Sequence, residues 1–159
     1  VLHCTADDDK PDADVFRLAK YDVGPDCHIN PGIGCPTITY HYYIESVSGE
    51  VVVYQCLDHS VKAWHVGPHW NATALAVALD YDGTSTLPQA KWDAAAKLIA
   101  FLCQDIGLPV SAVKFHRELQ YTGWTEGPNG EKVYRKACPG FPLDPYEFRS
   151  AVAEHLAAL

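Results

Sequence analysis

Two histidines and one cysteine from three distant parts of the chain form the set with the clearest chemical meaning. His3 lies in an apolar run at the start, His116 ends the short segment at 113–116, and Cys138 stands in Lys136-Ala-Cys-Pro. Two imidazoles and one thiolate suit an open zinc site, because three protein ligands leave the fourth tetrahedral position to water or a substrate oxygen. A structural zinc site usually takes four ligands from compact Cys-x-x-Cys pairs, and the sequence has no such pair. The set therefore predicts catalysis.

The composition indicates one globular domain that covers residues 1–159. Apolar residues make up 48% and charged residues 20%, which is typical of a chain with a packed core. The formal net charge of −8 argues against nucleic-acid binding, which depends on lysine and arginine, and against adsorption to anionic membranes. No apolar run approaches about 18 residues, so we expect no membrane span. No secretory leader pattern is visible, and the cellular location stays open.

Six cysteines at low density do not resemble the framework of a small disulfide-rich protein. We expect Cys4, Cys56 and Cys103 to be buried free thiols, since each lies among core-type residues. Cys27 and Cys35 share one loop rich in glycine and proline, where they either form a disulfide or remain reduced. The reduced state is the one we favour.

Apolar periodicity divides the chain into short strands and a few helices. The continuous apolar run at 74–80 is typical of a central strand, and Ser48-Gly49-Glu50 predicts a turn between two strands. Seven apolar side chains recur three or four residues apart in a segment that Pro88 opens and Gly107 closes, which predicts a long helix. We expect strands at 1–5, 39–46, 51–55, 74–80 and 113–116, a hairpin at 121–134, and helices at 12–21, 88–106 and after an N-terminal cap at Asp144.

Six short segments, taken in order along the chain, resemble the type 2 family of zinc-dependent N-acetylmuramoyl-L-alanine amidases. That family includes phage lysozyme-like amidases and peptidoglycan recognition proteins. The resemblance implies a single α/β domain with a central mixed β-sheet flanked by helices. It also implies hydrolysis of the amide between N-acetylmuramic acid and the L-alanine of the stem peptide in peptidoglycan. The segments are Leu2-His-Cys-Thr-Ala, Tyr40-His-Tyr-Tyr-Ile, Ala63-Trp-His-Val-Gly, Asn71 before Ala74-Leu-Ala-Val-Ala-Leu, Phe115-His-Arg-Glu and Lys136-Ala-Cys-Pro-Gly.

The resemblance assigns roles at the metal. His3, His116 and Cys138 match the three zinc ligands, with cysteine in the third position as in the phage and recognition-protein branch. Tyr40 matches the tyrosine that hydrogen-bonds beside the reacting oxygen, and Lys136 matches the lysine of the phage-type enzymes. Each residue alone has a plainer interpretation: a structural histidine, a core tyrosine or a solvated lysine. The joint pattern is what favours the site.

The resemblance also implies substrate contacts from Trp64, His65 and Asn71. Packing of His65 against Trp64 and a turn-forming Asn71 are the structural alternatives. His41 should point away from Tyr40 because side chains alternate along a strand, which predicts a buried hydrogen-bonding histidine.

The leading hypothesis is a zinc amidase of the endolysin or prophage type that acts as a monomer on bacterial peptidoglycan. One alternative is a recognition module that binds muropeptides without cleaving them, which the cysteine ligand at 138 argues against. The other is a cytosolic amidase that recycles anhydro-muropeptides. Ala78 argues against that second alternative, because the resemblance places a carboxylate base there in the cytosolic branch.

Overall fold

The computed structural model describes residues 1–5, 14–27, 32–66, 68–119, 124–126, 132–134, 138–140 and 142–159. Its centre is a four-stranded sheet in the order β1-β4-β2-β3. The first three of these strands run parallel, and the last pairs antiparallel with its neighbour. This mixed sheet confirms the expected α/β fold. The strands are β1 (Leu2–Cys4), β2 (Tyr42–Val47), β3 (Glu50–Gln55) and β4 (Val77–Leu79).

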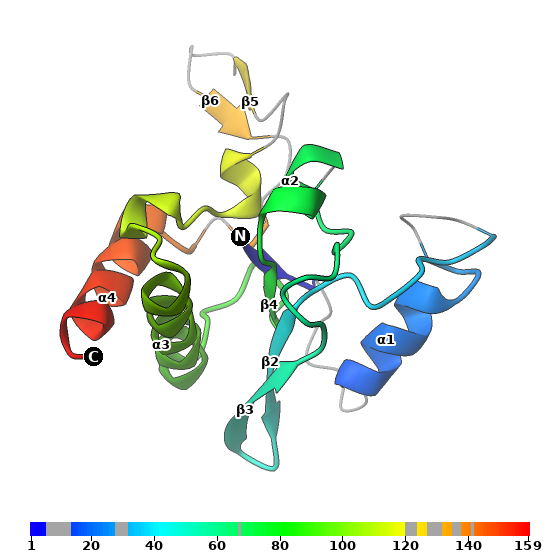
Figure 1. Cartoon of the computed structure of the whole chain (residues 1–159), viewed down its shortest axis with the longest axis horizontal. Helices are drawn as coiled ribbons and strands as arrows, with labels where there is room; N and C mark the ends of the chain where they lie inside the picture. Colours follow the sequence, from blue (N-terminus) through cyan, green and yellow to red (C-terminus); the bar gives the residue numbers. More distant parts are fainter. Residues whose placement is uncertain are drawn as a thin grey trace.

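Helices cover both faces of the sheet. Helices α3 (Gln89–Ile106) and α4 (Pro145–Ala157) stand on one side, and α1 (Val15–Val23) stands on the other (Figure 1). Strand alternation divides the core accordingly. Leu79 belongs to the cluster under α3 and α4, while its neighbour Ala78 belongs to the cluster under α1. None of the described helices is long and apolar enough to span a membrane.

The two long helices follow the sequence pattern closely. Five of the seven predicted stripe residues of α3 are buried, whereas Trp92 is half-buried and Ile106 is exposed. The helix ends where Gly107 adopts a left-handed conformation with φ 69°. Its first residue is Gln89, so Pro88 precedes the helix rather than occupying its first position. Helix α4 begins as predicted, because Asp144 accepts hydrogen bonds from the backbone N–H groups of Tyr146 and Glu147.

One expected strand is absent from the described residues, and one helix was missed. Residues 113–116 do not form a strand: Phe115 makes a single parallel bridge to Leu2, between 3-10 helices at Val110–Ala112 and His116–Glu118. The sequence analysis also missed α2 (Pro68–Thr73), because six residues are too few to display a helical periodicity. The predicted hairpin is confirmed in its strands, β5 (Trp124–Glu126) and β6 (Lys132–Tyr134), which pair antiparallel. Its turn lies outside the described residues.

All six cysteines are free thiols. Cys103 is buried as expected, whereas Cys4 and Cys56 are only half-buried, because the segments that carry them lie at the margins of the two core clusters. The Sγ atoms of Cys27 and Cys35 lie 3.4 Å apart in buried surroundings. The pair is therefore reduced in this structure, as we favoured.

His41 is the buried hydrogen-bonding histidine that strand alternation predicted. Its Nδ1 accepts from the N–H of Ala76 at 3.1 Å, and its Nε2 lies 3.0 Å from the carbonyl oxygen of Val61. Burial lowers the pKa of His41 below its ordinary value of 6.5.

This lowered pKa makes stability depend on pH. Between the unfolded pKa near 6.5 and the lower folded pKa, the unfolded chain binds more protons at His41 than the folded chain does, so the free energy of unfolding should fall as the pH decreases through that range. His41→Asn should flatten that dependence, which chemical denaturation at pH 5, 6 and 7 would measure against the wild type. An unchanged slope would contradict the assignment.

Candidate metal centre

The structure brings His3, His116 and Cys138 together from the three distant segments. One ligand atom from each lies within 4.8 Å of the other two. Cys138 Sγ is 3.7 Å from His3 Nδ1. In tetrahedral zinc with ordinary Zn–N and Zn–S bond lengths, neighbouring nitrogen and sulfur ligands stand about 3.5 Å apart. The donor types and this spacing therefore fit a zinc ion.

His3 owes its place to the alternation of β1. Leu2 points into the core under α3, so His3 points to the opposite face of the sheet, where it is opposite Ala78 in the neighbouring strand. The His3 side chain is 1% exposed. Ala78 therefore places a methyl group beside the ligand cluster. A residue with a carboxylate at this position would lie next to His3.

Backbone contacts hold the other two ligands against β1. The bridge between Leu2 and Phe115 delivers His116, whose ring centroid lies 4.6 Å from that of His3. Cys138 is held by the N–H of Cys4, which lies 3.3 Å from its Sγ. The positions of all three ligands thus depend on β1, which carries His3 and contacts Phe115 and Cys138.

Arg117 ties the two outer ligands to each other, and the sequence analysis did not identify it. Its backbone N–H donates to the carbonyl oxygen of Cys138 at 3.0 Å. Its guanidinium donates to the carbonyl oxygens of Gly140 and Leu143. The side chain is 7% exposed, so the charge is buried and bound to backbone oxygens. Its position directly after the ligand His116 is the sequence feature that could have identified it.

Gly140 marks a close approach of two backbones beside Cys138. It adopts φ +129°, and a Cβ atom there would stand 2.6 Å from the carbonyl oxygen of Gly83. This is why the segment after the cysteine ligand contains glycine.

Gly140→Ala should lower the free energy of unfolding by about 1–3 kcal/mol or more, through backbone strain and this contact. Gly49→Ala is the matched control, since Gly49 has φ +86° but nothing within 4 Å of the added Cβ. Urea denaturation would measure both. Equal losses in the two variants would mean that the contact with Gly83 has no cost.

Tyr40 lies beside the cluster, with its ring centroid 5.3 Å from that of His3. The preceding residue fixes this segment, because Thr39 donates from both its N–H and its hydroxyl to Asp22 of α1, at 2.8 Å each. Burial and the nearby Cys138 raise the pKa of the Tyr40 phenol. The hydroxyl is therefore protonated at neutral pH and available as a hydrogen-bond donor.

The predicted substrate residues Trp64, His65 and Asn71 are neighbours around one loop. His65 Nδ1 lies 3.0 Å from Nε2 of His3, and burial lowers the pKa of His65 to about 3. The Asn71 side chain accepts from the N–H groups of His65 and Val66, at 2.8 Å each. Trp64 is half-buried beneath the ammonium of Lys62, 5.0 Å from its ring centroid. Their substrate contacts stay a prediction, and Lys136 lies outside the described residues.

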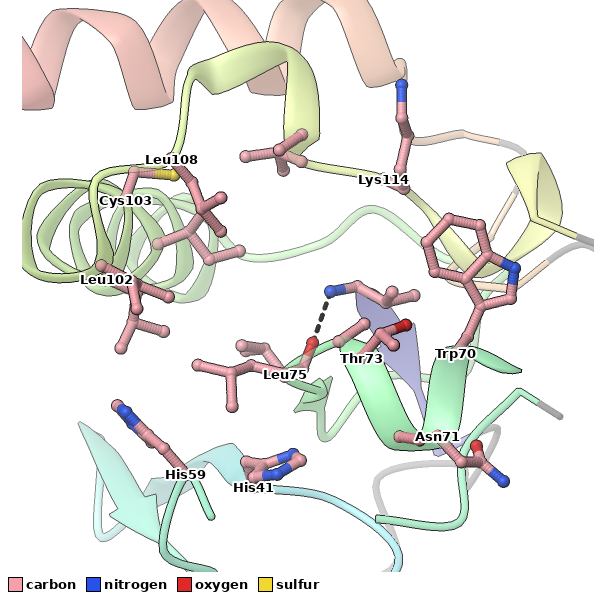
Figure 2. Close-up of a pocket in the computed structure, with 18 of the residues that line it drawn as sticks. His41, His59, Trp70, Asn71, Thr73, Leu75, Leu102, Cys103, Leu108 and Lys114 are labelled. Atoms are coloured by element: carbon pink, nitrogen blue, oxygen red, sulfur yellow. Dashed lines mark hydrogen bonds between the residues drawn. The ribbon is translucent and has the colours of Figure 1, made fainter. Parts of the chain in front are cut away.

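A cavity of about 540 Å³ lies on the α3 side of the molecule (Figure 2). Its lining is mostly apolar and includes Leu75 and Leu102, with the Val1 amino group donating to the Leu75 carbonyl oxygen at 2.6 Å. His3, His116 and Cys138 do not line it. This cavity is separate from the metal centre.

Comparison with known proteins agrees with this geometry. The sequence model of a family described as N-acetylmuramoyl-L-alanine amidase matches residues 1–141. The match includes every residue of the ligand cluster and stops shortly before α4. No curated protein matches the chain.

Proposed function

The chain belongs to the N-acetylmuramoyl-L-alanine amidase family, and on that premise we propose that it is a zinc-dependent enzyme of the endolysin or prophage type. Family membership supports amidase activity on peptidoglycan in general. The convergence of His3, His116 and Cys138 is the observation that carries the dependence on zinc. The substrate is the amide between N-acetylmuramic acid and L-alanine, and the enzyme acts as a monomer on the bacterial wall.

Residues of the chain have separate proposed roles around that ion. When bound, zinc supplies Lewis-acid polarisation of a carbonyl oxygen and lowers the pKa of water towards neutrality. Tyr40 donates a hydrogen bond to the oxygen on which negative charge develops, since its raised pKa keeps the phenol protonated. The family resemblance assigns Lys136 the role of a positive charge near the same oxygen. Trp64 and Asn71 form part of the wall that receives the glycopeptide.

Two features favour this reaction over the alternatives. A thiolate ligand at Cys138 completes a three-ligand set, which a module that only binds muropeptides does not need. Ala78 faces the cluster from β4 and offers no carboxylate base of the kind implied for cytosolic recycling amidases.

The proposal is tested by metal content and by the product. We expect about one zinc per purified chain and the release of free L-alanine N-termini from purified cell walls. Soluble anhydro-muropeptides should be poorer substrates than intact walls. A zinc-free chain that binds walls without releasing N-termini would support the recognition module instead.

A further inference from the structure

We infer that His65 is a positioning residue that sets which nitrogen of His3 faces the metal. The inference rests on the proposed function and deepens it. In this role the His65 ring does not contact the substrate. It links the backbone carbonyl oxygen of Ala74 to the His3 ring through two hydrogen bonds.

This series of hydrogen bonds begins at a backbone carbonyl oxygen, which can only accept a hydrogen bond. The carbonyl oxygen of Ala74 lies 3.3 Å from His65 Nε2, so that nitrogen carries the hydrogen. In a neutral imidazole the other nitrogen is then an acceptor, which makes His65 Nδ1 the partner of a donor. His3 Nε2 lies 3.0 Å from it and must be that donor.

The same logic assigns the remaining nitrogen of His3. With hydrogen on Nε2, Nδ1 is the unprotonated nitrogen of His3, and it is the atom that lies 3.7 Å from Cys138 Sγ. A metal-ligating histidine usually donates its other N–H to a neighbouring acceptor, which fixes the tautomer and orients the ring. Here the acceptor is a second histidine rather than a carboxylate or a backbone oxygen.

The protein holds His65 in place from two directions. Asn71, in α2, accepts from the backbone N–H of His65, while the Ala74 carbonyl oxygen just after α2 accepts a hydrogen bond from Nε2 of its ring. The ring centroids of His3 and His65 lie 5.0 Å apart in an edge-on arrangement. Both side chains are nearly inaccessible, at 1% and 7% exposed, so solvent is a poor substitute for either partner. Asn71 of α2 and the Ala74 carbonyl oxygen thereby act on the metal centre through His65.

Two substitutions separate this role from simple packing. His65→Asn keeps an acceptor oxygen near the position of Nδ1, whereas His65→Gln keeps an amide near Nε2, where it can bind only the Ala74 carbonyl. Loss of such a partner typically weakens metal binding about 10- to 100-fold. We expect that loss in zinc affinity for His65→Gln, measured by chelator competition, and near-wild-type affinity for His65→Asn.

The cobalt-substituted proteins give a second readout, since thiolate-to-cobalt absorption reports the geometry at Cys138. The spectrum should change in His65→Gln and be retained in His65→Asn. His41→Asn is the matched control, because His41 is also buried and uses both ring nitrogens, but on Val61 and Ala76. It should leave zinc affinity unchanged.

Nitrogen-15 NMR of the zinc-loaded wild type tests the same inference without any variant. We expect hydrogen on Nε2 of both His3 and His65. Hydrogen on Nδ1 of His65 would overturn the inference, as would equal zinc affinities for His65→Asn and His65→Gln. A wild-type chain that binds no zinc would instead remove the proposed function on which the inference rests.

Discussion

Cys138→Ser is expected to abolish turnover and to remove most of the bound zinc. A thiolate bonds to zinc and contributes its negative charge, while a serine hydroxyl stays protonated near neutral pH and is a much poorer ligand. Losing an outer-shell partner already costs about 10- to 100-fold, so loss of a direct ligand should exceed a hundredfold in wall hydrolysis. Zinc content per chain and the release of L-alanine N-termini would measure the two effects.

Cys103→Ser provides the control for this change. Cys103 is a buried thiol of α3 that lines the cavity on the other side of the molecule (Figure 2), so the same substitution there should leave zinc content and turnover intact. Its buried hydroxyl should cost about 1–3 kcal/mol of stability if left without a partner, so the assay belongs well below the unfolding temperature. Undiminished hydrolysis by Cys138→Ser would rule out the assigned metal site.

The ligand cluster could be predicted because two histidines and a cysteine have few joint uses, and because the short segments that carry them resemble those of the amidase family. Arg117 shows the opposite case. An arginine between a ligand and a glutamate looks like a solvated surface charge, and only the folded chain places its guanidinium on the Gly140 and Leu143 carbonyl oxygens.

The fold was predictable where an apolar periodicity extends over several helical turns. It was poorly predictable where a segment pairs with a strand far away in the sequence. Helix α3 shows five turns of apolar spacing, and its end at Gly107 follows from local backbone chemistry. The segment at 113–116 looks like a strand because apolar Val113 and Phe115 alternate with Lys114 and His116. Whether such a segment becomes a strand depends on how many residues of the neighbouring strand pair with it. Here β1 pairs with it through one bridge, between Leu2 and Phe115.

The loop around His65 shows what a resemblance implies and what geometry adds. Sequence similarity placed Trp64, His65 and Asn71 together at the substrate groove. Their proximity around one loop is found, but the His65 ring bonds to His3 and to the Ala74 carbonyl oxygen, and the Asn71 side chain accepts from two backbone N–H groups. No local pattern encodes the pairing of His3 with His65, because it joins residues 62 positions apart.

Tyr40→Phe should lower kcat about a hundredfold or more while leaving KM and zinc content close to those of the wild type. The hydroxyl is proposed to donate to the oxygen that becomes charged in the transition state, and removing one such preorganised donor typically costs about 10²- to 10³-fold in kcat. The ring stays, so its packing beside His3 is kept. Steady-state kinetics on a soluble muropeptide and zinc analysis would measure these quantities separately.

Tyr42→Phe is the matched control, because it makes the same change two residues further along the chain on the face towards α3. There the hydroxyl hydrogen-bonds to His59 at 2.6 Å, and its loss should cost about 1 kcal/mol of stability without a fall in kcat. A Tyr40→Phe enzyme with wild-type kcat would mean that transition-state charge is stabilised by other donors, with Lys136 the first to examine. A rise in KM alone would make Tyr40 a binding residue, since an interaction equal in ground and transition states leaves kcat unchanged.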